Sequence, residues 1–413
     1  MGIESKINTM LSSTPIVKKT VKRLYQLGMY AISPKIKSEG DIKRITPIDD
    51  NYEYFFGYYD KSPWDITDRY MLCLRVKNTT KESAPSEPAD IILIDTHNSN
   101  SYEVLATTRT WNVQQGTMLQ WVGPSYDEEI IYNDYRNGQY CSVILNVFTK
   151  EERVIDRPVY TVATNGEFAL SLDFSRLHRM RPGYGYSNLE EITKSEKIPV
   201  GPCIWSINLK ENTSQPVLSY TDFFNFETRD DMKGAEHKVN HIMLNPSGTR
   251  FMVLHRWLQG SKKYTRLVTA NVDGSDMFNL SDDNMTSHCF WKNDEEIIAY
   301  AHKKETANGY YLMTDKTNDY SHVWQELKSD GHPSFSADGK YAITDTYPDK
   351  ARIARVFLIH NGHIKTLAKV FAPFKYDNDF RCDLHPRWNR ESNKVCFDSV
   401  FEGKRGLYTV NID

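Results

Sequence analysis

The stretch GHPSFSADGKYAITD, residues 331–345, contains the pattern that decides the fold. It places a histidine three residues before an aromatic residue, then a polar turn ending in Asp-Gly, then a short apolar strand. Asp-Gly favours a tight turn, and the run that follows is rich in strand-forming side chains. The stretch therefore predicts two antiparallel strands joined by a turn.

The same unit recurs along the chain at intervals of roughly 40–50 residues, the period typical of a β-propeller. Each copy places an aromatic or apolar anchor before a second apolar strand. The seven anchors are Trp64, Trp121, Val162, Leu244, Trp291, Phe335 and Trp388. Seven such units predict an all-β fold, a seven-bladed β-propeller, in which radial repetition protects the strand edges.

Composition narrows the class of protein. The 413 residues are 39% hydrophobic and 25% charged, with a formal net charge of −3, so the chain is globular and no nucleic-acid partner is expected. The sequence contains no apolar run long enough for a transmembrane segment and no secretory signal, so we expect a cytoplasmic protein. The six cysteines are dispersed without a CxxC pair, which favours buried free thiols.

The chain divides into an N-terminal segment and the propeller. Residues 1–40 predict a short basic amphipathic helix and a linker, and residues 41–413 the propeller, with an insertion at about 176–236 over one face. The helix has two interpretations. It packs against the propeller, or it makes a weak contact with an anionic membrane surface.

Four histidines occupy one position of the repeat in consecutive units. They are His241, His288, His332 and His385. Equivalent repeat positions form a ring at one depth of a propeller, so these imidazoles are expected to converge. Converging imidazoles, with the carboxylate of Asp383 on the same side of its strand as His385, suit a divalent cation such as Mn²⁺, Zn²⁺ or Fe²⁺. The alternative is that each histidine caps a turn of the repeat.

The ends of the second strands predict a rim of polar side chains on the face of the histidine ring. A polar rim beside a metal suits an anionic ligand such as an acidic sugar. The rim residues expected to bind such a substrate are Arg136, Arg176, Asp345 and Tyr347, and those expected to act in catalysis are His241, His255 and Arg256.

The C-terminal half resembles the oligogalacturonate lyases, with part of the likeness being the general repeat of TolB-type propellers. Residues 286–291, TSHCFW, resemble the family's Thr-His-Glu-Phe-Trp segment, and residues 383–388, DLHPRW, resemble its His-Pro-His-Pro-Ser-Phe segment. Residues 401–408, FEGKRGLY, are also similar. The resemblance implies a seven-bladed propeller that holds a manganese-type ion and cleaves uronic-acid oligosaccharides by β-elimination.

Carried over by position, the resemblance assigns His288 and His385 as metal ligands. Asp383 stands where the family has a histidine, and His332 is added because it lies between them in the ring. The metal ligands expected are therefore His288, His332, Asp383 and His385, with manganese favoured over zinc or iron. Residues 1–236 carry no such resemblance.

Three functions remain open from the sequence. The first is a metal-dependent lyase acting on acidic oligosaccharides or polysaccharides. The second is another glycan-processing or glycan-biosynthesis enzyme on the same scaffold. The third is a non-catalytic TolB- or WD40-like interaction propeller, since a fold does not by itself imply a function.

Overall fold

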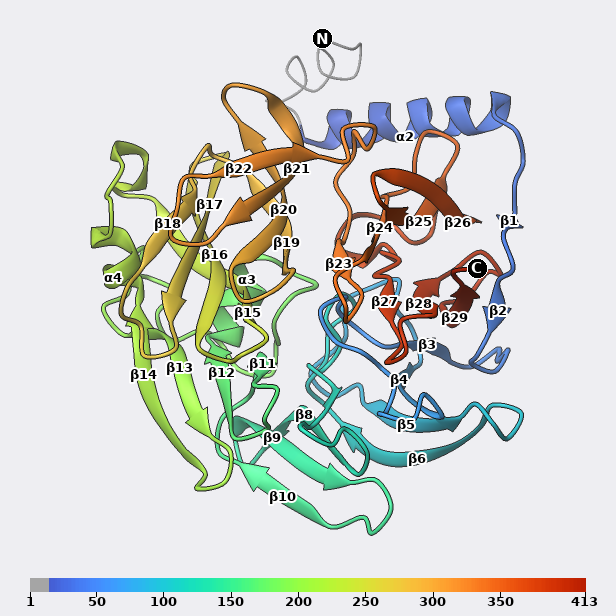
Figure 1. The fold of residues 1–413 in the computed structure, drawn as a ribbon, viewed down its shortest axis with the longest axis horizontal. Coiled ribbons are helices and arrows are strands. Elements are labelled where there is room, and N and C mark those ends of the chain that lie inside the picture. Colours follow the sequence, from blue (N-terminus) through green and yellow to red (C-terminus); the bar gives the residue numbers. More distant parts are fainter. Residues whose placement is uncertain (1–14) are drawn as a thin grey trace.

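The computed structural model describes residues 15–413, and seven antiparallel sheets arranged around a central axis make up most of this part of the chain (Figure 1). Each sheet is one blade, with its first strand nearest the axis. The prediction of a seven-bladed β-propeller is confirmed. Residues 1–14 of the expected N-terminal segment lie outside the described residues.

Blades 1 to 3 come from the first half of the chain. Blade 1 holds β3 (Glu53–Phe55), β4 (Tyr70–Val76), β5 (Ala89–Asp95) and β6 (Ser101–Thr108). Blade 2 holds β7 (Gln120–Trp121), β8 (Glu129–Arg136), β9 (Gln139–Asn146) and β10 (Glu152–Ile155). Blade 3 holds β11 (Thr161–Val162), β12 (Phe168–Leu172), β13 (Pro202–Asn208) and β14 (Thr213–Ser219).

Blades 4 to 7 carry the four histidines. Blade 4 holds β15 (Glu236–Leu244), β16 (Arg250–Gln259), β17 (Lys262–Asn271) and β18 (Phe278–Ser281). Blade 5 holds β19 (Thr286–Trp291), β20 (Glu296–Lys303), β21 (Ala307–Thr314) and β22 (Tyr320–Val323). Blade 6 holds β23 (Ser334–Phe335), β24 (Tyr341–Asp345), β25 (Ile353–His360) and β26 (His363–Phe371). Blade 7 holds β27 (Arg387–Trp388), β28 (Lys394–Ser399) and β29 (Gly406–Asn411).

The N-terminal chain completes the last two blades. Strand β2 (Lys43–Arg44) pairs antiparallel with β29 and supplies the fourth strand of blade 7, with Lys43 opposite Thr409. Strand β1 (Ser38–Glu39) pairs with β26 as a fifth strand of blade 6. Each addition covers an edge that would otherwise expose unpaired backbone groups.

The aromatic anchors tie neighbouring blades together. Trp121 of blade 2 is buried, and its Nε1–H donates to the Pro63 carbonyl of blade 1 at 2.9 Å. Trp291 of blade 5 donates in the same way to the Met243 carbonyl of blade 4 at 3.0 Å. A buried indole needs such a partner for its N–H, so these bonds fix the contact between blades while the rings fill the space between sheets.

The expected insertion at about 176–236 is only partly an insertion. Strands β13 and β14 of blade 3 lie within it. The additional structure is α3 (Phe174–Met180) with the loop that follows, and α4 (Tyr220–Asn225) with the short helix η1 (Asp230–Met232). Residues 176–236 therefore combine two strands of blade 3 with these additional helices and loops.

The N-terminal helix α2 spans Pro15–Ile32 and packs against the loop that follows blade 6, which contains the short helix η2 (Asn378–Phe380) (Figure 1). Arg23 Nη2 donates to the Phe374 carbonyl at 2.9 Å, and Tyr30 stacks on Phe371 with ring centroids 5.4 Å apart. Among residues 15–413, no helix combines the length and apolarity needed to span a bilayer. All six cysteines are buried and unpaired, as expected.

Candidate metal and catalytic site

The four histidines of the repeat lie side by side near the axis. The ring centroids are 5.5 Å apart for His241 and His288, 4.1 Å for His288 and His332, and 4.3 Å for His332 and His385. All four are buried. The expected convergence of the imidazoles is therefore present in the structure.

Local backbone geometry aims these side chains. His241 and His385 have positive φ angles of 56° and 46°, and the pairing of β15 with β16 shifts register between Asn240 and Met243. The pairing of β19 with β20 shifts between Thr286 and Cys289, on either side of His288. Bulges and left-handed residues redirect a side chain out of the regular alternation of a strand, and such backbone strain gathers at functional sites.

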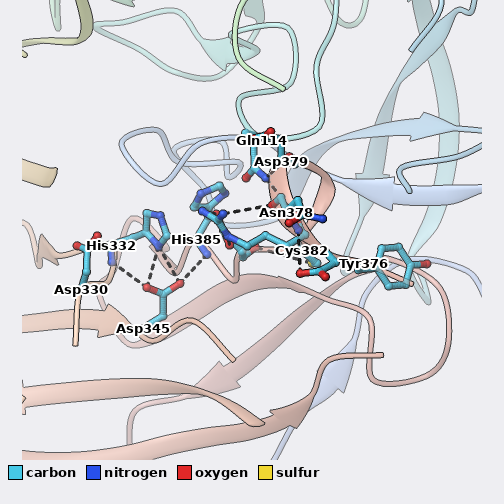
Figure 2. Close-up of polar contacts among 12 residues, drawn as sticks. Gln114, Asp330, His332, Asp345, Tyr376, Asn378, Asp379, Cys382 and His385 are labelled. Carbon is cyan, nitrogen blue, oxygen red and sulfur yellow. Dashed lines mark hydrogen bonds and ion pairs between the residues drawn. The ribbon is translucent and has the colours of Figure 1, made fainter. Parts of the chain in front are cut away.

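Two of the imidazoles are oriented through Nδ1 and leave Nε2 without a partner. His332 Nδ1 lies 2.8 Å from Asp345 Oδ1 (Figure 2). His385 Nδ1 lies 2.9 Å from the Gly57 carbonyl. The Nε2 atoms of both find no hydrogen-bond partner among the described residues. A histidine that ligates a metal characteristically donates its other N–H to a carboxylate or carbonyl in this way.

Asp383 completes a group of three that could hold a metal ion. One ligand atom each from His332, Asp383 and His385 lies within 4.8 Å of the other two. The Asp383 carboxylate is held by Arg381, with contacts of 2.6 and 2.9 Å. Two unpartnered imidazole nitrogens and one carboxylate fit a divalent ion that accepts mixed nitrogen and oxygen ligands.

His288 lies beside this group without belonging to it. Its Nδ1 is 3.0 Å from Asp330 Oδ1, and Ser287 Oγ donates to the other oxygen of Asp330 at 2.6 Å. Burial lowers the pKa of His288, although Asp330 partly offsets this effect. The structure thus groups three of the four residues predicted as ligands, and the role of His288 stays a prediction.

A cavity of about 370 Å³ opens over the histidines. His241, His288 and Tyr347 line it, together with Arg381, whose guanidinium also contacts Asp383. His332, Asp383 and His385 are not among its lining residues. The group lies next to the cavity, because Arg381 contacts Asp383 and the ring centroid of His288 is 4.1 Å from that of His332.

The cavity wall is strongly cationic. It includes Arg181, Lys238, Arg256, Lys263, Arg352 and Arg381. Lys238 bonds only to the Met180 carbonyl, whereas Arg256 and Lys263 have no hydrogen bond or ion pair with any side chain that the structure describes. Arg256 lowers the pKa of Lys263 to about 8, with burial as the second cause. Cations without a carboxylate partner favour an anionic ligand.

Two of the three predicted catalytic residues face this cavity. His241 and Arg256 both line it. His241 Nε2 is hydrogen-bonded to the Tyr58 hydroxyl, while its Nδ1 has no partner among residues 15–413. Burial lowers the pKa of His241 well below its ordinary value, and the charge of Arg256 adds to this, so the imidazole is neutral and able to accept a proton.

The third, His255, is placed elsewhere, which corrects the expectation that it acts on substrate. Its Nε2 lies 2.8 Å from His237 Nδ1, and Arg266 Nε donates to its Nδ1 at 3.1 Å. It does not line the cavity. His255 neighbours Arg256 on β16, so the two side chains point to opposite faces of the sheet.

Of the four residues predicted at the rim, Tyr347 lines the cavity and the other three do not. Arg176 is inaccessible to solvent, contacts Glu191 at 2.5 Å and donates to the His237 carbonyl at 2.7 Å. Arg136 pairs with Glu152 and Asp134, both at 2.8 Å, away from the cavity. Neither arginine is placed to bind substrate, because each already has partners within its own part of the fold.

Asp345 also differs from the expectation, because it holds histidines in place and does not line the cavity. It accepts hydrogen bonds from the His332 backbone N–H at 2.8 Å and the His385 backbone N–H at 3.1 Å, besides its bond to the His332 ring (Figure 2). Burial raises the pKa of Asp345, but the charge of His332, its two hydrogen bonds and the charge of His288 together outweigh burial and the pKa is lowered.

Three residues of the site were not among those predicted. Tyr58 and Tyr59 come from blade 1, and Arg381 comes from the loop before blade 7. The segment after β3 crosses the axis, where Tyr58 contacts His241 and the Tyr59 hydroxyl donates to the Cys289 carbonyl at 2.7 Å. The aromatic run at 54–59 was a signal for both tyrosines. Arg381, two residues before Asp383, could have been found by the same alternation that placed Asp383.

Comparisons with known proteins agree with this fold. No protein-family model matches the sequence, and no curated protein matches it. Among solved structures, the oligogalacturonate lyase of Vibrio parahaemolyticus is similar with a TM-score of 0.63 and 13% identity, over 90% of this chain and 93% of that one. An oligogalacturonate lyase in complex with manganese has a TM-score of 0.66 and 15% identity, over 92% and 95%. The chain therefore shares the seven-bladed propeller fold of these lyases.

Proposed function

We propose that the chain is a metal-dependent lyase that cleaves uronic-acid-containing oligosaccharides by β-elimination. One observation carries the proposal. The Nε2 atoms of His332 and His385 are buried beside Asp383 without a hydrogen-bond partner among the described residues, next to a cavity in which Arg256 and Lys263 have no carboxylate partner. The likeness in fold to an oligogalacturonate lyase that binds manganese supports the choice of chemistry.

The cationic wall supports an acidic substrate. Arg256 and Lys263 offer charge to a sugar carboxylate without first breaking an internal ion pair. Charge-assisted bonds to a carboxylate are about twice as strong as neutral ones. Tyr347 and Tyr184 also line the cavity, with Arg381 and Arg181 over their rings.

His241 is the proposed base. In the tautomer whose Nε2–H donates to the Tyr58 oxygen, Nδ1 carries the lone pair. This nitrogen removes the proton next to the uronate carboxylate, and the electron pair forms a C=C bond to the adjacent carbon. The glycosidic C–O bond on that carbon breaks, and the leaving oxygen takes a proton from water. Burial raises the pKa of Tyr58 well above its ordinary value, so the phenol stays protonated and holds the ring.

His332, Asp383 and His385 would hold a divalent ion, which when bound would neutralise the substrate carboxylate and so acidify the adjacent C–H. The mixed nitrogen and oxygen donors suit manganese. Arg256 adds fixed positive charge where the carbanion develops, which is the arrangement expected of a preorganised site.

The test uses purified full-length protein. We expect bound manganese by elemental analysis, and ultraviolet absorbance from an unsaturated uronate when oligogalacturonate is added. A His332→Ala, His385→Ala double variant should lose both, whereas His363→Ala, an exposed histidine of blade 6, should lose neither.

Two outcomes contradict the proposal. Cleavage that yields new reducing ends without unsaturated product would indicate another glycan-processing enzyme. Protein without bound metal and without activity on acidic glycans would indicate an interaction propeller.

A further inference from the structure

The N-terminal helix α2 presents an unusual pair of faces. The side chains that contact the propeller are polar or aromatic. Arg23 reaches the Phe374 carbonyl and lies 3.6 Å from Asp377 Oδ2, Tyr30 packs on Phe371 and Phe374, and Gln26 lines the cavity. Residues 23, 26 and 30 follow helical spacing and so form one face.

The opposite face is apolar and exposed. Leu24 is 64% exposed, Leu27 is 44% exposed, and Ile32 at the end of the helix is 78% exposed. Gly28 and Ala31 are exposed on the same side. A helix on the surface of a globular protein normally turns its apolar side chains toward the core. In α2 Val21 and Met29 are half-buried, whereas Leu24, Leu27 and Ile32 remain exposed. An exposed apolar stripe of this kind marks a surface that a partner covers.

The charge around α2 indicates which partner. Residues 15–37 contain six basic residues and no acidic one. Since the whole chain has 51 basic and 54 acidic residues, the rest of the chain has 45 and 54, a net charge of −9. The positive charge is therefore concentrated in the segment of sequence that contains the exposed leucines.

We infer that α2 docks the protein on an anionic lipid surface, with Leu24 and Leu27 entering the boundary between headgroups and acyl chains. Apolar side chains with a surplus of Lys and Arg are the composition of helices that lie in a membrane interface. A second copy of the chain is disfavoured as the covering partner, because it would bring the same six cations together.

This docking places the cavity at the lipid surface. Gln26 lines the cavity, and Arg23 of the same helix holds the loop of Asp377, which also lines it. The inference extends the proposed function by location and does not depend on the metal or on the chemistry.

Vesicle flotation tests the inference with the full chain. We expect binding to vesicles of phosphatidylcholine mixed with phosphatidylglycerol, weaker binding to phosphatidylcholine alone, and weakening by salt. The Leu24→Asp, Leu27→Asp variant should bind at least ~10-fold more weakly, because each buried leucine contributes on the order of 1.5 kcal/mol or more. The matched control is Ile192→Asp, Val200→Asp, two side chains exposed by 95% and 78% in the loop before β13, which should bind as the unaltered protein does.

Other results would overturn the inference. These are absence of binding to the anionic vesicles, equal binding by both double variants, or light scattering that shows a dimer which the Leu24→Asp, Leu27→Asp variant dissociates. Unfolding curves of the variants guard against misfolding, and since both leucines are exposed we expect unchanged midpoints. Metal content is measured on the same samples, so failure of docking is distinguishable from failure of the proposed lyase site.

Discussion

His332 and Asp345 form a buried pair in which Nδ1 lies 2.8 Å from Oδ1, with both side chains 1% exposed. Burial lowers the pKa of His332, but the charge and hydrogen bond of Asp345, together with the charges of Asp383 and Asp330, outweigh burial and the pKa is raised. The same carboxylate accepts the backbone N–H of His385. One aspartate thus positions two of the three proposed metal ligands.

Replacing this aspartate should weaken metal binding without removing a ligand. We expect Asp345→Asn to lower manganese affinity ~10- to 100-fold, because the partners behind ligating histidines have effects of this size. Calorimetric titration measures it. Asp338→Asn, on an exposed turn of the same blade, serves as the control, and equal affinity in both variants would mean that Asp345 does not orient the ligands.

Removal of the metal should lower stability. A ligand present at 100 times its Kd adds ~2.7 kcal/mol to the free energy of unfolding. We therefore expect a chelator to lower the midpoint of thermal unfolding and added manganese to restore it. The His332→Ala, His385→Ala variant should show no response to either, and a response equal to that of the unaltered chain would place the metal elsewhere.

Replacing the proposed base should lower activity without removing the metal, whereas replacing the proposed ligands should remove the metal. We expect His241→Ala to lower kcat by ~100- to 10,000-fold, the range of general-base catalysis, while its manganese content stays unchanged. Tyr58→Phe should lower kcat less, because the ring keeps its place but loses the hydrogen bond to His241. Loss of metal in His241→Ala would instead make His241 a ligand.

Binding of acidic glycans should weaken as the pH rises through about 8. Lys263 has a pKa of about 8 because Arg256 and burial disfavour its charged form, so it is a cation below this pH and neutral above it. The affinity for oligogalacturonate, measured by titration between pH 7 and 9, should follow that change. Lys263→Met should bind more weakly at pH 7 and lose the dependence, whereas Lys262→Met, next to it on the exposed end of β17, should keep it.

Arg176 should matter for stability and not for binding. Its guanidinium is inaccessible to solvent and pairs with Glu191, so Arg176→Ala leaves a buried carboxylate with fewer partners. Breaking a buried pair costs about 3–5 kcal/mol. Denaturant unfolding should show a loss of this order, whereas Arg136→Ala, whose partners are more exposed, should cost about 0–1 kcal/mol. A larger loss of stability in Arg136→Ala than in Arg176→Ala would contradict the structural role of Arg176.

The repeat made the blades and the histidines predictable because it is periodic. Each blade uses the same anchor to fill the same space, so the sequence shows the repeat directly, and rotation then places His241, His288, His332 and His385 together. The rim was less predictable. The end of a strand fixes how far a residue lies along the axis, whereas the direction of its side chain depends on alternation within the strand and on neighbouring segments.

His255 and Arg256 illustrate this dependence on side-chain direction. They are adjacent on β16, yet Arg256 lines the cavity and His255 contacts His237. Arg176 is a second example. It lies on helix α3 and is buried in the fold, where it contacts Glu191 and donates to the His237 carbonyl. Strand β2 closes blade 7 through two residues, too few to carry a strand pattern.

The sequence by itself determined the number of blades, the ring of histidines and the charge of the N-terminal helix, because these follow from local pattern and composition. Only the tertiary structure decided which side chains face the cavity and which face of α2 is exposed, because both depend on contacts between segments far apart in the chain.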